Sequence, residues 1–251
     1  MAKDFWETVA MKNPTWKHNL PENEEFFHWF KPKQGKNTIR ILPSWTNQDP
    51  FAKQFWLEVR NHWSVSSTTK TPIVCTETTP GVPGECPVCA LINRVAKNTS
   101  SKYAQERCNQ VRPSPSYYLN VIDRDDPTWL VRDTALFKYA HPNIPLPFRL
   151  GAAKVQAFSA SPSVFKAIMA QQKNYPAPIS DPLQGADVVF YRSGSGHTTR
   201  YKVAPFVRCS MAVHYDKLNN LENLISLLPL AQIRKILAAS DLHKLANLGK
   251  L

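Results

Sequence analysis

Alternating apolar and polar positions predict a series of β-strands along the chain. The first covers Asn37 to Pro43, where Ile39 and Ile41 alternate with Arg40. A second strand, rich in aromatic and β-branched residues, is predicted from Phe51 to Trp63. Further strands are predicted at Ser116–Asp123, near Leu130–Tyr139, at Asp187–Arg192 and at Thr199–Val203, the last two forming a hairpin around Ser193–Gly196.

Helical periodicity appears in three places. After Cys89, the residues Ala90, Leu91, Val95 and Ala96 follow a helical spacing. A helix is predicted over Pro162–Gln172, with Ser161 at the N-cap and proline in the first turn. The Leu-rich C-terminal part is predicted to hold one helix beginning near Pro229 and a shorter one capped by Ser240, and we expect its apolar stripe to pack on the β-barrel.

This order of elements predicts a mainly β fold with helical additions. A small Greek-key, partly open barrel of the OB type accommodates the strands, with an inserted zinc-binding subdomain and a helical C-terminal segment. The expected organisation has four parts: an N-terminal arm at 1–25, an OB-fold core at 26–215, a zinc-binding subdomain at 62–110 within that core, and a helical segment at 216–251.

Composition and charge narrow the class of partner. The chain of 251 residues has 31 Lys and Arg against 19 Asp and Glu, a formal charge of +12, which favours a polyanion such as nucleic acid. Only 8 glycines occur, and the phosphate-binding motifs G-x-x-x-x-G-K-[ST] and G-x-G-x-x-G are both absent from the sequence.

No run reaches the ~18 apolar residues of a membrane span, so no membrane partner is expected. The N-terminal residues also lack the apolar run of a secretory signal. An odd number of cysteines, 5, suggests reduced thiols in a cytoplasm.

Four residues in the first third of the chain have the spacing of a metal site. Cys86 and Cys89 form a Cys-Pro-Val-Cys pair, and Cys75 and His62 lie at loop distances before it. Four such ligands predict a structural Zn²⁺ that holds a polar insertion together. Two alternatives stay open: a redox dithiol at Cys86 and Cys89, and Cys108 in place of His62 as the fourth ligand.

Basic and aromatic residues are interleaved, as non-specific single-strand binding requires, because cations follow the phosphates while rings stack on bases. Neighbours on a strand face opposite ways, so only one of Phe55 and Trp56, and one of Tyr117 and Tyr118, is expected to face nucleic acid. The candidate nucleic-acid residues are Arg40, Trp45, Lys53, Phe55, Trp56, Arg60, Arg107, Arg112, Tyr117, Tyr118, Arg132, Tyr139, Arg192, Arg200 and Tyr201.

The sequence resembles the T-even-type bacteriophage single-stranded-DNA-binding (helix-destabilising) proteins. Three stretches carry the likeness: Lys-Pro-x-x-Gly-Lys-Asn before Ile-Arg-Ile-Leu-Pro at 31–43, the run from Asn61-His62-Trp63 to Cys86-Pro87-Val88-Cys89, and Ser116–Val121. The resemblance implies an OB-fold interrupted by a zinc subdomain and a non-enzymatic role in DNA replication, recombination or repair. It also implies single-stranded DNA, the protein itself along the strand and replication enzymes as partners, in the cytoplasm of an infected bacterial host.

Two features depart from that family. Residues 1–25 are mixed in charge, whereas the family has a basic N-terminal segment that makes cooperative contacts. Residues 216–251 also lack the acidic tail with which the family recruits replication enzymes.

Three other functions remain open on the sequence. A metal-dependent nuclease is one, with Asp123, Asp125 and Asp126 as carboxylate ligands, although an Asp-rich turn before Pro127 is the simpler interpretation. The others are an RNA- or DNA-binding zinc protein and a replication scaffold whose C-terminal helices dock a partner enzyme.

Overall fold

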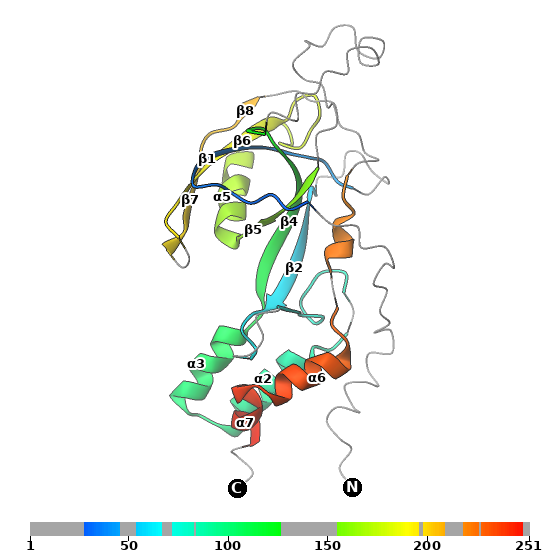
Figure 1. Ribbon diagram of the computed structural model, residues 1–251, viewed down its shortest axis with the longest axis vertical. Coiled ribbons are helices and arrows are strands. Elements are labelled where there is room, and N and C mark those ends of the chain that lie inside the picture. Colours follow the sequence, from blue (N-terminus) through cyan, green and yellow to red (C-terminus); the bar gives the residue numbers. More distant parts are fainter. Residues whose placement is uncertain are drawn as a thin grey trace. The chain divides into compact units, whose positions relative to one another are not determined.

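The computed structural model describes residues 28–45, 54–66, 72–82, 84–126, 155–195, 198–208, 218–225 and 227–247 (Figure 1). The chain divides into two compact units. Unit 1 comprises residues 1–24, 58–116 and 225–251, and unit 2 comprises residues 25–57 and 117–224. The strand predicted near 130–139 lies outside the described residues.

Unit 2 is built on an open antiparallel sheet. Its strands are β1 (Gly35–Ile41), β4 (Ser114–Asp123), β5 (Gln156–Ala160), β6 (Ala186–Ser193), β7 (Arg200–Val203) and β8 (Val207–Arg208). The order is β4-β1-β6-β7, with β5 paired to β4 and β8 paired to β6. Ile39 lies opposite both Asp123 of β4 and Val188 of β6, so β1 pairs with a strand on each side. Its buried positions therefore fix the register of both neighbouring strands.

The core of unit 2 is aromatic. Helix α5 (Pro162–Gln172) covers one face of the sheet and buries Val164, Phe165 and Ile168 against it (Figure 1). Phe158 and Phe190 stack with ring centroids 6.0 Å apart, and Phe30 meets both rings edge-on. Offset and edge-to-face pairs of this kind stabilise a core beyond the area they bury.

Unit 1 is mainly helical. It holds the end of β2 (Trp56–His62), the short β3 (Ile73–Val74), α2 (Pro87–Asn98), α3 (Lys102–Val111), α6 (Leu230–Ala238) and α7 (Asp241–Asn247). The four helices lie together (Figure 1) and share a core of aliphatic residues and cysteines, including Val95 of α2, Val111 of α3, Leu237 of α6 and Leu242 of α7. The C-terminal helices thus pack on α2 and α3, which corrects the expectation that their apolar stripe would pack on the barrel.

The structure confirms the predicted fold class: an open, mostly antiparallel sheet with added helices and a Cys/His cluster, consistent with an OB-like fold and a metal-binding subdomain. The helix predicted at Pro162–Gln172 begins and ends at those residues. The elements α3, β3, β5 and β8 have no counterpart in the sequence predictions. Within the described part of the chain, no helix has the length and apolar character needed to cross a lipid bilayer.

Candidate metal centre and nucleic-acid residues

Local structure brings the four predicted ligands together within unit 1. His62 is the last residue of β2, and Asn61 and His62 pair with Val74 and Ile73 of β3 in an antiparallel hairpin. Cys75 follows β3 directly, and its backbone N–H donates to Arg60 O at 2.7 Å. Cys86 occupies the N-cap of α2, and Cys89 lies in the first turn of that helix. A hairpin and a helix N-terminus therefore converge on one point.

The distances between these side chains suit a tetrahedral ion. All four ligand atoms lie within 4.8 Å of one another. His62 Nε2 lies 3.2 Å from Cys86 Sγ and 3.6 Å from Cys89 Sγ, and Cys75 Sγ lies 3.6 Å from Cys89 Sγ. Zinc–sulfur bonds of about 2.3 Å require edges of about 3.8 Å between tetrahedral ligands. The sulfurs are too far apart for a disulfide, whose S–S bond is about 2.05 Å.

Contacts around the ligands fix their orientation. His62 Nδ1 lies 2.7 Å from Val111 O, the carbonyl at the end of α3, so Nδ1–H donates there and Nε2 is left as the ligand atom. The Thr78 hydroxyl donates to Cys75 Sγ at 3.1 Å. Such outer contacts hold a histidine in one tautomer and support a thiolate. The quartet can therefore hold a metal ion.

The titration of the cluster reflects the crowding of its ligands. Burial by itself lowers the pKa of His62, but hydrogen bonds with Cys75 and Cys86 raise that pKa to about 10. Hydrogen bonds from Cys86 and Cys89 lower the pKa of the Cys75 thiol, whereas hydrogen bonds with Cys75 and Cys86 raise the pKa of Cys89. The Cys75 thiolate is thus stabilised while ionisation of Cys89 is opposed, and a bound cation would relieve this conflict because it favours the deprotonated form of each ligand.

The cluster is enclosed by protein. His62, Cys75 and Cys86 are buried and Cys89 is half-buried. Cys108, the alternative fourth ligand, lies instead in the helical core, with its Sγ 3.9 Å from Ile92 O. Four protein ligands complete a tetrahedron and leave no position for a catalytic water, which is the chemistry of a structural site.

Two of the predicted nucleic-acid residues are buried in unit 2: Phe55 in its core, and Arg40 beneath the segment around Asp181 and Gly185. Arg40 is fully buried, and its guanidinium donates to Asp181 O. Phe55 is 2% exposed and meets the Trp56 ring edge-on with centroids 5.0 Å apart. Both side chains make contacts within the protein, and a buried Phe55 is the arrangement expected if Trp56 is the member of that pair that faces nucleic acid. Lys53, Arg132 and Tyr139 lie outside the described residues.

Three predicted arginines have partners within the chain. Arg107 Nε lies 2.8 Å from Asp241 Oδ2, and its Nη2 donates to Ser64 O. Arg192 donates to Pro32 O at 2.8 Å. Arg60, with a side chain 41% exposed, pairs with Glu58 at 2.8 Å. The side chain of Arg107 is only 12% exposed, so Arg60 is the more accessible of these two.

The predicted aromatics form contacts at the edge of the core of unit 2. Tyr117 stacks on Phe165 with centroids 3.8 Å apart, and Trp56 packs against the same ring at 5.2 Å. Tyr118 meets Trp29 edge-on, and Tyr201 packs on Phe190. Trp45, Trp56, Tyr117, Tyr118 and Tyr201 are all half-buried, so each keeps part of its surface accessible.

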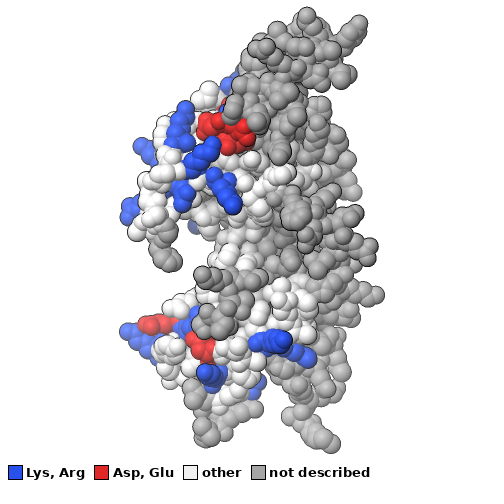
Figure 2. All heavy atoms as spheres, in the orientation of Figure 1, with Lys and Arg blue, Asp and Glu red and all other residues white. Residues whose placement is uncertain are grey.

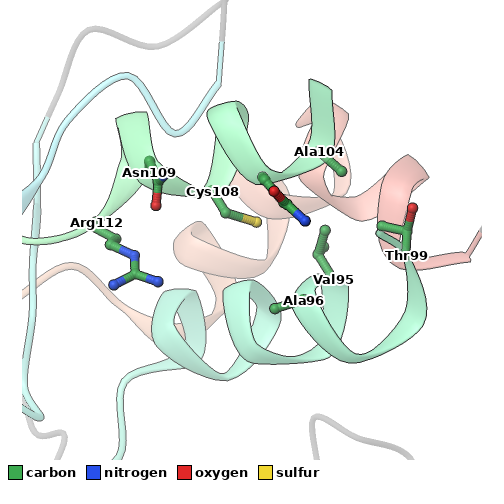
Figure 3. Close-up of a pocket in the computed structure, with 8 residues that line it drawn as sticks. Val95, Ala96, Thr99, Ala104, Cys108, Asn109 and Arg112 are labelled. Carbon is green, nitrogen blue, oxygen red and sulfur yellow. The ribbon is translucent and has the colours of Figure 1, made fainter. Parts of the chain in front are cut away.

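Among the described residues, Arg112 and Arg200 are the exposed arginines of the predicted set. Arg112 lines a cavity of about 220 Å³ between α2 and α3, with Val95, Cys108 and Asn109 among the other lining residues (Figure 3). Arg200 begins β7. Figure 2 shows Lys and Arg side chains gathered over the part of unit 2 that holds β1, β6 and β7.

Lys36, Tyr191 and Lys202 are further exposed residues in this part of unit 2. Lys202 is among the basic residues expected around the hairpin, whereas Lys36 and Tyr191 were not predicted as contacts. Strand alternation was the available signal for them, because Phe190 and Arg192 on either side of Tyr191 face the opposite way.

The aspartates proposed for a nuclease form a turn. Asp123 Oδ1 accepts from Asp125 N at 3.0 Å, and Asp125 Oδ2 accepts from Thr38 N at 2.8 Å. Lys33 Nζ lies 3.7 Å from the other oxygen of Asp123. Carboxylates that cap backbone N–H groups in this way are typical of an Asp-rich turn, and these contacts favour that interpretation over a catalytic metal site.

The fold and the cluster of one histidine and three cysteines together define a protein with an OB-like sheet and a subdomain that can hold a metal ion. Residues 33–144 match the family described as gp32 DNA binding protein like. The chain therefore carries a gp32-like DNA-binding domain, which confirms the resemblance to the T-even-type phage family. The family is one of DNA-binding proteins without catalytic activity. No curated protein sequence matches the chain.

Proposed function

We propose that this protein binds single-stranded DNA without sequence specificity, in phage DNA replication, recombination or repair. The observation that carries this proposal is the gp32-like match over residues 33–144, with the His/Cys cluster built inside the matched region. A net charge of +12 supports it, because phosphate contacts supply most of the affinity in binding of this kind.

Structural Zn²⁺ is the proposed occupant of the cluster. Three thiols and an imidazole suit zinc better than calcium or magnesium, which prefer oxygen ligands. His62, Cys75, Cys86 and Cys89 would hold the ion and tie the β2–β3 hairpin to the start of α2. The ion supplies fold stability in this proposal and takes no part in a reaction.

Base stacking and phosphate contacts carry the proposed binding. Trp56, Tyr117 and Tyr118 are half-buried aromatics held in place by neighbouring rings, which lowers the entropy cost of presenting a face to a base. Each base–aromatic stack contributes about 1–3 kcal/mol and tolerates any base. Arg200, Arg112 and Arg60 are accessible cations for phosphates.

The proposal extends to the cellular setting. The resemblance implies action in the cytoplasm of an infected bacterial host, where reduced thiols remain available for metal. It also implies contacts with further copies along the strand and with replication enzymes.

Metal analysis combined with DNA titration tests the proposal. We expect about one zinc per chain and tighter binding to an oligothymidine than to a duplex of the same length, because duplex bases are stacked inside and unavailable to protein rings. Affinity should fall steeply with salt, with a logarithmic slope near −0.7 per neutralised phosphate. A flat salt response, or equal binding to single strands and duplex, would contradict the proposed function.

Two further experiments separate the alternatives. Parallel titrations with RNA test the RNA-binding alternative, and incubation of labelled strands with Mg²⁺ or Mn²⁺ tests the nuclease alternative.

A further inference from the structure

Three strands of unit 2 place an aromatic ring between two lysines. In the antiparallel register, Lys36 of β1 lies opposite Tyr191 of β6, and Tyr191 lies opposite Lys202 of β7. Residues directly opposite on adjacent strands have their Cβ atoms about 4.5–5.5 Å apart and point to the same face. Lys36, Tyr191 and Lys202 therefore form one row across the sheet.

The row lies on the face away from the core. The neighbouring positions Asn37 and Phe190 are buried, and Tyr201 and Val203 pack against the aromatic core. Because side chains alternate along a strand, the row must project from the other face. Its exposure agrees: Tyr191 is 47% exposed, and both lysines are exposed.

The charge around the row is positive. Arg200 precedes Lys202 by two positions, so it lies on the same face, opposite Ser193 of β6. The other described positions of this face near Tyr191 are Thr38 and Val189, which pair with each other and carry no charge. An exposed carboxylate, that of Asp125, accepts from Thr38 N at 2.8 Å, and Arg40 of the same face is buried against Asp181 O. Further along β6, the acidic Asp187 is occupied by Arg124 at 3.1 Å. The patch thus offers three accessible cations around one ring and suits a polyanion with flat apolar groups.

We propose that Lys36, Tyr191, Arg200 and Lys202 form a single-stranded nucleic-acid contact on the outer face of the sheet, an inference that rests on the proposed function. A base stacks on the exposed ring of Tyr191, and the cations on both sides bind the flanking phosphates. Neighbouring strands lie about 4.8 Å apart, so the two lysine backbones lie about 10 Å apart across the ring. Flexible lysine stems span that distance to reach phosphates on either side of the stacked base.

Paired substitutions separate a binding role from a structural one. Tyr191→Leu removes the ring, whereas Tyr191→Phe keeps it. We expect Tyr191→Leu to weaken binding to a fluorescent oligothymidine at least about fivefold and Tyr191→Phe to stay within about twofold of the wild type. The double variant Lys36→Gln with Lys202→Gln should reduce the steepness of the salt dependence by about 1.4, the contribution of two phosphates.

The matched control removes two exposed lysines from helices of unit 1, Lys97→Gln with Lys244→Gln. This control should change the salt dependence less than the Lys36 and Lys202 pair does. An equal change would overturn the proposal because it would indicate a general charge effect.

Photocrosslinking to an oligonucleotide with 5-bromodeoxyuridine gives a direct readout, since a ring that only stabilises the sheet forms no adduct. We expect an adduct on Tyr191.

The outcomes distinguish this contact from the function on which it rests. Wild-type affinity in Tyr191→Leu, with no adduct at Tyr191, would overturn the contact alone. Equal weakening by Tyr191→Leu and Tyr191→Phe would also overturn it, because the loss would then follow the hydroxyl group. Failure of the wild-type chain to bind oligothymidine would overturn the proposed function together with the contact.

Discussion

The two units of this chain are stabilised in different ways. Unit 2 has a continuous ladder of antiparallel strands and a core of stacked and edge-on aromatic rings. The described core of unit 1 contains aliphatic residues and cysteines with no aromatic ring, and its hairpin and helices meet at the His/Cys cluster. A sheet spreads its stabilisation over many backbone pairs, whereas the proposed metal ion would concentrate it in four side chains. We therefore expect unit 1 to be the more vulnerable to a single change.

Loss of a metal ligand should have the largest effect. Cys75→Ala removes one thiolate from the cluster, and we expect the purified protein to lose its metal. Structural zinc contributes roughly 10–16 kcal/mol in peptides that fold only around the ion. Even a fraction of that value exceeds the effect of most core substitutions. Calorimetry should show a lowered transition for unit 1 and an unchanged one for unit 2.

The matched control for this prediction is Cys108→Ala, which changes a buried cysteine outside the cluster. It should retain about one metal ion per chain as measured by mass spectrometry. Metal retained by Cys75→Ala, or lost from Cys108→Ala, would show that the ligand set is different.

Core substitutions should separate the two units. Leu237→Ala in α6 and Ile168→Ala in α5 each remove a fully buried side chain, and each should cost about 2–5 kcal/mol in its own unit. Only Leu237→Ala should speed the release of metal to a chelator, because Leu237 packs in the core that supports the cluster. Similar release rates in both variants would contradict the division into independently stabilised units.

The buried Arg40 provides a test confined to unit 2. Arg40→Met keeps most of the stem but removes the hydrogen bond from the charged guanidinium to Asp181 O, which still accepts from Gly185 N at 2.9 Å. Loss of a hydrogen bond that involves a charged group costs about 1.5–3 kcal/mol. Urea unfolding measures this loss. DNA affinity of the folded variant should stay within about twofold of the wild type, and a larger drop would return Arg40 to the set of DNA contacts.

The weakest expected effect is at the ion pair between α3 and α7. Burial raises the pKa of Asp241, but hydrogen bonding and attraction from Arg107 outweigh it, so the pKa lies below the ordinary 3.8. Asp241→Asn should cost under about 1 kcal/mol, because the carboxylate is partly exposed to solvent. A depressed pKa means that the stabilisation is present above pH 3.8 and is lost as the pH falls through the folded-state value. Unfolding curves of the variant and the wild type should therefore converge in acid, and a constant difference would contradict the ion pair.

The sequence predicted the features that depend on local spacing. The Cys-Pro-Val-Cys pair and the two ligands before it were recognisable because a chelate needs particular residue types at short intervals. The helix at Pro162–Gln172 was predictable from its proline-initiated apolar run. The helix α3 was missed although Ala104, Cys108 and Val111 follow a helical spacing, since its mean composition is polar and its apolar positions are small.

Features that depend on contacts between residues far apart in the sequence could not be predicted from local patterns. Arg40 lies between two apolar residues in the sequence, which is the pattern of a solvent-facing position on a strand. In the structure, the segment around Ile179–Gly185 covers Arg40 and buries its side chain. The position of the C-terminal helices was likewise missed, because an apolar stripe shows that a helix packs without showing on what. Strand pairing, which brings Lys36, Tyr191 and Lys202 into one row, joins segments that are far apart in the sequence.

The discontinuity of unit 1 has a consequence for biosynthesis. Residues 58–116 leave the ribosome well before residues 225–251, and all of residues 117–224 are made in between. During that interval α2 and α3 lack the helices that complete their core, while the β2–β3 hairpin and the start of α2 are already available to capture an ion. Early metal capture would therefore protect the nascent thiols from oxidation until the last helices emerge.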